Sequence, residues 1–326
     1  MSWRISLGAV IMIALLAAAS LFAGRVHLPP EVMLRGIMEA KPNAAWLILT
    51  ELRLPRTVLV LLVGATLGLS GAVLQGLLRN PLAEPGLLGV TGGASLGAVI
   101  AIYFGLSSGI ALATPLAGIA GALLAGLLTF VVGRGGTLSL ILAGAAVSGL
   151  MGAGLSLALN FAPNPYAAYE ITSWLLGSAA DRSWPEILLA VPFILTGWLL
   201  LALTGRGLDA LSLGEEQAES LGVDVARVRF LALAGTALAV GAATAVTGSV
   251  GFVGLVAPHL VRPLVGWRPR AVLLPAALLG ALVLLATDVT TRLIPTDVEL
   301  KLGVLTSLIG TPFFFWLVLY LRRQQQ

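Results

Sequence analysis

The longest stretch of this chain without a charged side chain spans residues 85–133 and reads PGLLGVTGGASLGAVIAIYFGLSSGIALATPLAGIAGALLAGLLTFVVG. It is apolar on every face, without the alternation of polar and apolar side chains that a β-barrel strand shows. A helix needs about 20 apolar residues to cross a bilayer. The stretch therefore predicts two membrane-spanning helices, joined by a turn near residues 107–109.

The remainder of the chain is equally apolar. Of its 326 residues, 58% are hydrophobic and only 10% are charged, and the mean hydropathy is +1.00. These values exclude an ordinary soluble protein and indicate an integral membrane protein. Eight stretches of 17 residues or more contain no Asp, Glu, Lys or Arg: residues 5–24, 57–78, 85–133, 135–169, 187–205, 230–261, 271–287 and 302–321.

One further stretch, residues 230–261, is too long for a single helix. It contains four helix-breaking residues, Gly248, Gly251, Gly254 and Pro258. We therefore expect a full span followed by a short one. With two spans in residues 85–133 and one in each other stretch, the sequence predicts an all-α integral membrane protein of about ten transmembrane helices. Residues 1–326 then form a single transmembrane domain with both termini on one side.

Lys and Arg near the helix ends set the orientation of a membrane protein. With the N-terminus inside, eleven are cytoplasmic: Arg4, Arg79, Arg134, Arg206, Arg227, Arg229, Arg262, Arg268, Arg270, Arg322 and Arg323. Eight lie outside: Arg25, Arg35, Lys41, Arg53, Arg56, Arg182, Arg292 and Lys301. This split predicts that both termini are cytoplasmic. We expect the first helix to stay as an uncleaved anchor, although residues 17–19 resemble a signal-peptide cleavage site.

Several function classes are disfavoured by composition. The chain has no cysteine, which excludes a disulfide scaffold, a Cys-ligated zinc site and a thiol nucleophile. The pI near 10 comes without a basic block of five or more residues, so we expect no nucleic-acid partner. We also expect no cofactor and no resident metal.

The source of energy is constrained by what the spans lack. Ion-coupled carriers keep ionisable side chains within their spans, and the span interiors here contain no Asp, Glu or Lys. Asp288 and Arg292 stand four residues apart at the outer end of the ninth helix, where they can pair or face water. A phosphate loop needs a lysine, and neither Lys41 nor Lys301 lies in such a motif. If ATP drives this protein, a separate ATPase subunit must dock on it; an ion-coupled carrier is the alternative.

A third class, an intramembrane hydrolase, has a weak motif. Residues 93–97 read GASLG, which matches the G-x-S-x-G pattern around a serine nucleophile, and His259 is a candidate base. The pattern requires a strand-to-helix elbow, whereas Ser95 lies at the start of an apolar helix. Glycines four apart are more typical of close helix packing, as at Gly64 and Gly68.

The interval 206–229 is the best candidate for a cytoplasmic docking element. Residues 212–215 read SLGE, a capping box that predicts the start of a short helix. Gly222 is placed to end this helix. Ala218 and Leu221 would give it a small apolar face.

A family resemblance covers nearly the whole chain. The chain resembles the permeases of type II ABC importers for iron chelates and cobalamin, a group typified by FecCD-like proteins. The segments that carry it are RLPR at 53–56, LSGAVLQG at 69–76, NPLAEPGLLG at 80–89, LG at 213–214 and at 221–222, GFVGLV at 251–256 with Pro258 and His259, and EL at 299–300 with GV at 303–304 before Gly310.

The resemblance implies an assembly in the bacterial inner membrane, surrounded by lipid. Its parts would be a homodimer of this chain with the passage on the two-fold axis, two separate ATPase subunits and a periplasmic substrate-binding protein. The chain itself would be a permease and not an enzyme, because the partner hydrolyses ATP. No catalytic residue is expected in it.

The resemblance also assigns residues to three sites. ATPase docking is implied for Gly214, Glu215, Ala218, Leu221 and Gly222. Docking of the substrate-binding protein is implied for Arg53, Arg56 and Arg292. A cytoplasmic gate is implied for Asn80, Leu82 and Thr137.

The cargo is left open by these motifs, because the haem, siderophore and cobalamin permeases share them. We favour a ferric siderophore or haem, with cobalamin as the alternative. Two features depart from the family: Lys301 stands where many relatives carry proline, and residues 163–166 match no family motif.

Overall fold

The computed structural model describes residues 2–24, 31, 44–110, 112–294, 296 and 298–324. This part of the chain is helical and contains no strand. Its helices are α1 (Ser2–Phe22), α3 (Ala44–Leu47), α4 (Leu54–Leu77), α5 (Val90–Tyr103), α6 (Leu106–Gly109), α7 (Ala113–Val132), α8 (Thr137–Asn160), α9 (Pro165–Leu175), α10 (Trp184–Leu203), α11 (Gly205–Leu211), α12 (Glu215–Ser220), α13 (Val225–Thr247), α14 (Val253–Val265), α15 (Pro269–Leu293) and α16 (Leu302–Gln324). A π-helical segment, Ile48–Arg53, joins α3 to α4, and a 3₁₀ turn, Pro85–Leu88, precedes α5.

Seven of the described helices are long and apolar enough to cross a membrane: Ala44–Leu77, Ala113–Val132, Thr137–Asn160, Trp184–Leu203, Val225–Thr247, Pro269–Leu293 and Leu302–Leu319. Three shorter apolar helices are Ser6–Phe22, Val90–Tyr103 and Val253–Val265. Since α5 rises only about 21 Å at 1.5 Å per residue, it is shorter than a bilayer core of about 30 Å. The protein is a multi-pass membrane protein, and the count of ten spans stays a prediction.

The two long charge-free stretches divide as expected. Residues 85–133 form α5 and α7, with the short helix α6 where a turn was predicted. Residues 230–261 form most of α13 and then enter α14. The break lies at residues 248–252, where Gly248 and Phe252 have positive φ angles of 73° and 66°. Gly254 and Pro258 lie inside α14, so the prediction that they break the helix is wrong.

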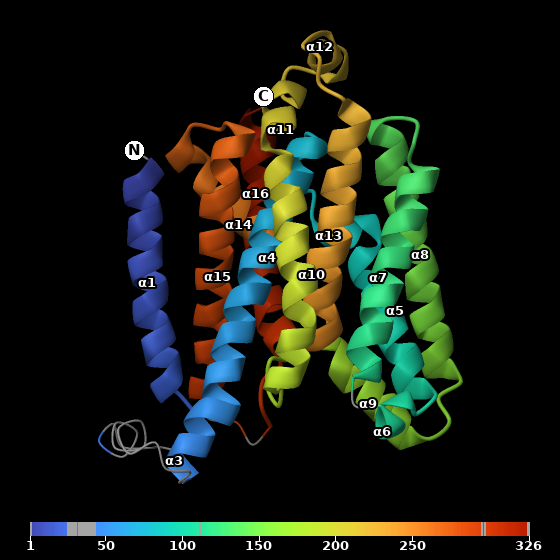
Figure 1. Ribbon diagram of the computed structural model, residues 1–326, viewed down its shortest axis with the longest axis vertical. Coiled ribbons are helices and arrows are strands. Elements are labelled where there is room, and N and C mark those ends of the chain that lie inside the picture. Colours follow the sequence, from blue (N-terminus) through green and yellow to red (C-terminus); the bar gives the residue numbers. More distant parts are fainter. Residues whose placement is uncertain are drawn as a thin grey trace.

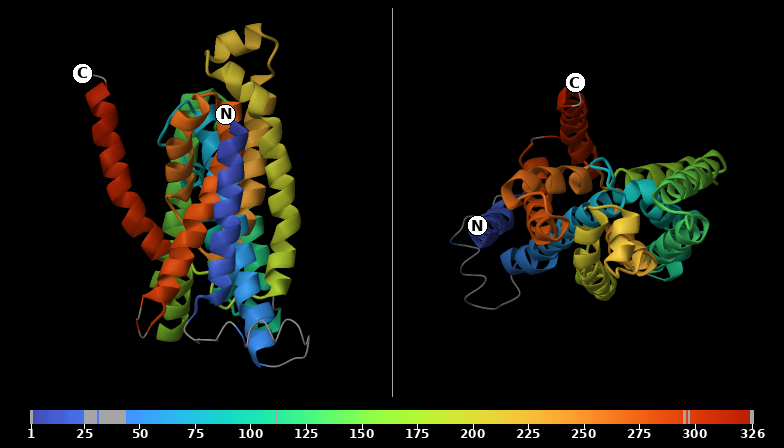
Figure 2. Two further views of the ribbon diagram at one scale, coloured as in Figure 1. Left: turned by 90° about the vertical axis from the view of Figure 1, so that its left-hand side faces the viewer. Right: turned by 90° about the horizontal axis from the view of Figure 1, so that it is seen from above.

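The two ends of the bundle differ (Figure 1). The start of α1, the end of α16 and the protruding α12 lie at one end, here called the α12 end. The helices α3, α6 and α9 lie at the other, here called the α3 end. Figure 2 shows α16 leaning away from the remaining helices toward the α12 end. The start of α1 and the end of α16 therefore lie at the same end of the bundle, and the prediction that both termini are cytoplasmic stays a prediction.

Two helices form the centre of the bundle. In the most apolar stretch of each helix, about 78% of the residues are buried in Ala44–Leu77 and in Val225–Thr247. The corresponding share is 28% in Thr137–Asn160 and in Trp184–Leu203. The central helices bury Leu59, Val60 and Val240 completely. In contrast, α8 and α10 expose many large apolar side chains, as expected for helices that face lipid or a second subunit.

Glycines allow the helices to approach closely. A Cβ atom on Gly68 would lie 2.1 Å from the backbone oxygen of Ala276 in α15, and one on Gly97 would lie 2.1 Å from that of Ala117 in α7. Real Cβ atoms do not come so near. The predicted role of these spaced glycines in helix packing is confirmed.

Candidate functional site

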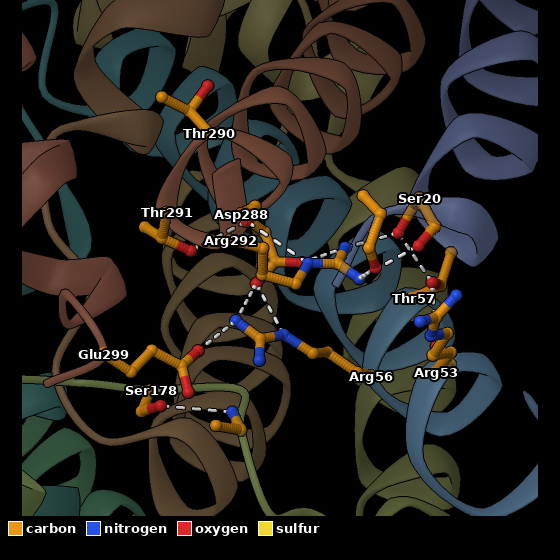
Figure 3. A network of polar contacts seen from close by, with 12 residues as sticks. Ser20, Arg53, Arg56, Thr57, Ser178, Asp288, Thr290, Thr291, Arg292 and Glu299 are labelled. Atoms are coloured by element: carbon orange, nitrogen blue, oxygen red, sulfur yellow. Dashed lines mark hydrogen bonds and ion pairs between the residues drawn. The ribbon is translucent and has the colours of Figure 1, made fainter. Parts of the chain in front are cut away.

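A buried carboxylate organises the charges at the α3 end. Asp288, on the last turns of α15, has no solvent-exposed surface. Its Oδ1 accepts a hydrogen bond from Arg56 Nε at 2.9 Å, and its Oδ2 accepts one from Arg292 Nη2 at 2.6 Å. Figure 3 shows Asp288 between the two guanidinium groups. The sequence predicted that Asp288 and Arg292 could pair, and they do.

Two of the arginines also bind the end of α1. Arg292 Nη1 donates to the Ser20 backbone oxygen at 2.9 Å and to that of Ala23 at 3.2 Å. Arg53 Nη1 donates to the backbone oxygen of Leu21 at 2.7 Å. The last carbonyls of a helix lack partners within it, so these guanidinium groups cap α1. They fix α1 to the π-helical segment that leads into α4 and to α15.

Glu299 supplies the second carboxylate of this cluster. Its Oε1 lies 2.5 Å from Arg56 Nη2, and its side chain is 29% exposed. Beside it is a cavity of about 220 Å³ whose lining includes Arg53, Arg56, Asp181, Arg182, Arg292 and Glu299. The three arginines predicted to bind a partner protein therefore lie together at one end. Sequence reasoning did not find that Asp288 and Glu299 already pair with Arg56.

Of the other predicted outer cations, Arg182 lines this same cavity and Lys301 does not. Arg182 forms an ion pair with Glu186 at 3.0 Å, four residues along the chain. Lys301 lines a separate cavity of about 390 Å³ at this end, together with Glu170 and Trp174. Arg25, Arg35 and Lys41 lie outside the described residues.

At the opposite end, α12 forms the predicted short helix without the predicted capping box. Gly214 is the residue before the helix, and the Ser212 hydroxyl donates to the Asp209 backbone oxygen at 2.6 Å instead. The Glu215 carboxylate has other partners, described below, so it does not reach back to Ser212. The helix ends as predicted: Gly222 has a φ of 80°. Its amide donates to the Glu219 oxygen.

The predicted docking residues divide into two groups. Gly214 and Ala218 are buried, and α12 contacts α11 and α13. Leu221 is 66% exposed, and Gly222 beside it is exposed as well. Leu213 is a further exposed apolar residue of this surface. The exposed apolar side chains beside α12 are therefore Leu213 and Leu221, which flank the helix, and not Ala218.

Glu215 connects α12 with two other helices. Its Oε1 accepts a hydrogen bond from the Thr137 hydroxyl at 2.5 Å, and its Oε2 accepts one from Arg229 Nη2 at 2.6 Å. The Thr137 hydroxyl is the main reason why the pKa of the Glu215 carboxyl is lowered; burial opposes this effect, and Arg229 and Arg79 add to it. The carboxylate is therefore charged at neutral pH. A predicted gate residue, Thr137, is thus bonded to a predicted docking residue.

The other two gate candidates form a turn after α4. The Asn80 side-chain oxygen accepts a hydrogen bond from the Leu82 amide at 2.9 Å, and the Asn80 backbone oxygen accepts one from Ala83. This arrangement explains the asparagine, because its short side chain closes a turn on its own backbone. Within the described residues, the Thr137 hydroxyl bonds to Glu215 and not to this turn.

The features of a hydrolase do not come together. Ser95 is buried in the second turn of α5, between two glycines that pack against α7. His259, on α14, makes an edge-to-face contact with Phe313 of α16 at 6.0 Å between ring centroids. A nucleophile elbow places its serine between a strand and a helix, and Ser95 lies inside a helix.

A large open cavity lies beside α16. Its volume is about 750 Å³, and small, apolar and hydroxyl-bearing residues line it, including Ser249, Gly251, Gly303, Ser307 and Thr311. Another part of the wall is formed by Leu175, the last residue of α9, and by Leu176, which follows it. The helix α9 was not predicted, although Asn164 followed by Pro165 is typical of a helix start. The Asn164 side chain caps α9 through the Ala167 amide at 2.8 Å.

Long apolar helices, a charged cluster at one end and a small polar helix protruding from the other define a multi-pass membrane permease. The chain belongs to the FecCD transport family, whose model matches residues 11–320.

Named relatives agree with this membership. The chain is 38% identical over 330 residues to the hemin transport system permease protein HmuU of Yersinia pestis, which covers 99% of this chain and 97% of the relative. It is 42% identical over 297 residues to the vitamin B12 import system permease protein BtuC of Vibrio cholerae, over 88% of each. A solved structure described as an inward-facing conformation of a metal-chelate type ABC transporter matches with a TM-score of 0.83 and 36% identity, over 98% of this chain and 99% of the other. The chain is an ABC importer permease.

Proposed function

We propose that this chain is the permease subunit of an ATP-driven importer in the bacterial inner membrane. It moves a metal chelate, a ferric siderophore or haem, from periplasm to cytoplasm, and a separate ATPase and a periplasmic binding protein act on its two ends. The observation that carries the proposal is α12, a small helix that protrudes from a chain with no phosphate loop. Cobalamin is the alternative cargo, because relatives named for hemin and for vitamin B12 are similarly close.

A homodimer supplies the passage in this proposal. The exposed face of α8 carries small residues four apart, Ala145, Gly149 and Ala153. Small residues let helices of two subunits approach closely in a membrane. We propose that the passage runs along the cavity beside α16. Its small and hydroxyl-bearing lining gives little affinity for cargo, which favours release of a bulky chelate.

The α12 surface is testable through Leu221. We expect Leu221→Gln to reduce retention of the ATPase on the purified permease about ten-fold, because an exposed apolar anchor of about 1.4 kcal/mol is removed. Leu221→Met keeps the apolar contact and is the matched control. Equal retention by the Gln and Met variants would show that Leu221 is not part of the docking surface.

The proposed binding-protein site lies at the arginine cluster. Because Arg53, Arg56 and Arg292 hold internal partners, an acidic partner has to compete with Glu299 for Arg56. We expect Glu299→Gln to tighten binding of the substrate-binding protein about three-fold at low salt, with a smaller gain at high salt. Glu170→Gln makes the same charge change at an exposed position near the other cavity, and we expect little effect. Weaker binding by Glu299→Gln would mean that Glu299 shapes the docking surface and does not compete with the partner.

A further inference from the structure

The start of α8 depends on a residue from another helix. Gly136 precedes α8 and offers no side chain to cap it, and the first turn contains no acidic residue. The free amides of this turn carry a partial positive charge that favours a carboxylate nearby. Glu215, which lies 78 residues away along the chain, brings that carboxylate to the Thr137 hydroxyl.

The two partners of Glu215 belong to helices at different places in the bundle. Arg229 lies on α13, a central helix whose apolar residues are 78% buried, whereas Thr137 begins α8, an outer helix whose apolar residues are 28% buried. One carboxylate therefore joins the centre of the bundle to a helix at its outer face. A displacement of α12 acts on α8 through this carboxylate.

We propose that the Glu215 carboxylate, through its hydrogen bond with Thr137, transmits the movement of α12 to α8. This hydrogen bond is called the tie below. Thr137 and Arg229 are positioning residues, because both hold the carboxylate in place. The inference rests on the proposed function, in which an ATPase displaces α12. It adds the point at which that displacement enters the membrane domain. The tie keeps the first turn of α8 and the first turn of α12 together throughout the cycle.

The test measures chelate transported per ATP hydrolysed, with the permease, its ATPase and its binding protein reconstituted in liposomes and ferrichrome or haem as the cargo probe. We expect Thr137→Val, which removes the hydroxyl donor, to lower this ratio at least five-fold while the ATPase still co-purifies. Thr137→Ser restores the donor and the ratio. Thr290→Val, at an exposed threonine of α15 whose hydroxyl bonds within its own helix, is the matched control.

A cross-link keeps the inference testable if Thr137→Val fails to fold. The chain has no cysteine, so Thr137→Cys with Glu215→Cys gives a unique pair. We expect a short thiol-specific cross-linker to restore the transport ratio that the unlinked pair loses. A cross-linked pair that does not transport, or Thr137→Val with a wild-type ratio, would overturn the inference alone. A wild-type chain that neither retains the ATPase nor transports would overturn the proposed function together with it.

Discussion

Replacing Gly71 with alanine is expected to prevent formation of the folded permease. A Cβ atom at Gly71 would lie closer to the Gly254 backbone oxygen, at 1.8 Å, than any contact allows, and 2.6 Å from the Gly254 carbonyl carbon. Both are backbone atoms, so no flexible side chain can turn away. Adding one methylene to a well-packed core costs about 1–3 kcal/mol, and a backbone clash exceeds that range. We expect little or no monodisperse protein in detergent.

The matched control for this substitution is on the same helix. A Cβ atom at Gly76 would have Leu208 side-chain atoms at 3.5 Å as its nearest neighbours, which is an ordinary contact. Gly76→Ala is therefore expected to fold and to gain a little stability, since alanine is favoured over glycine within a helix by about 1 kcal/mol. Comparable yields and unfolding temperatures for the two variants would contradict the α4–α14 packing described here.

The second large effect is expected at Asp288. Asp288→Ala leaves Arg56 and Arg292 largely buried while both lose their shared carboxylate. Removing one partner of a buried ion pair typically costs about 3–5 kcal/mol, because the remaining charge is uncompensated. We expect a lowered thermal unfolding midpoint in detergent and partial release of α1, which Arg292 holds. Thr290→Ala, two residues further along and exposed, should have little effect.

A double substitution separates the ion pair from simple loss of packing. Arg292→Leu removes one of the stranded charges, so Asp288→Ala with Arg292→Leu should lose less stability than the two single losses added together. Strict additivity would mean that Asp288 does not act through Arg292. Wild-type stability of Asp288→Ala would show that the cluster does not hold the α3 end together.

The sequence predicted the parts of the fold that depend on local pattern. The charge-free stretches gave the apolar helices, Gly248 marked the end of α13 and Gly222 the end of α12. Residues 163–166 match no family motif, yet they contain the cap of α9, which the sequence did not lead us to predict. The pair Asn164 and Pro165 is a local signal for a helix start, so α9 was predictable from the sequence.

The contacts that were missed join residues far apart in the chain. Arg56 and Asp288 are 232 residues apart, and Thr137 and Glu215 are 78 apart. No local pattern reports such pairs. The capping-box prediction was wrong for the same reason, because the Glu215 carboxylate found stronger partners in Thr137 and Arg229 than in Ser212. The motifs at residues 69–76 and 251–256 were similarly explained only in three dimensions, where the backbones of Gly71 and Gly254 pack directly against each other.

The central claim is that ATP hydrolysis by a separate ATPase subunit drives transport through this chain. The most direct measurement is chelate uptake into liposomes that contain the permease with its ATPase and binding protein, at constant ATP, before and after the proton gradient is dissipated. The account predicts uptake that requires ATP hydrolysis and continues without the gradient. Uptake by the permease alone that follows an ion gradient and stops when the gradient is dissipated would contradict it.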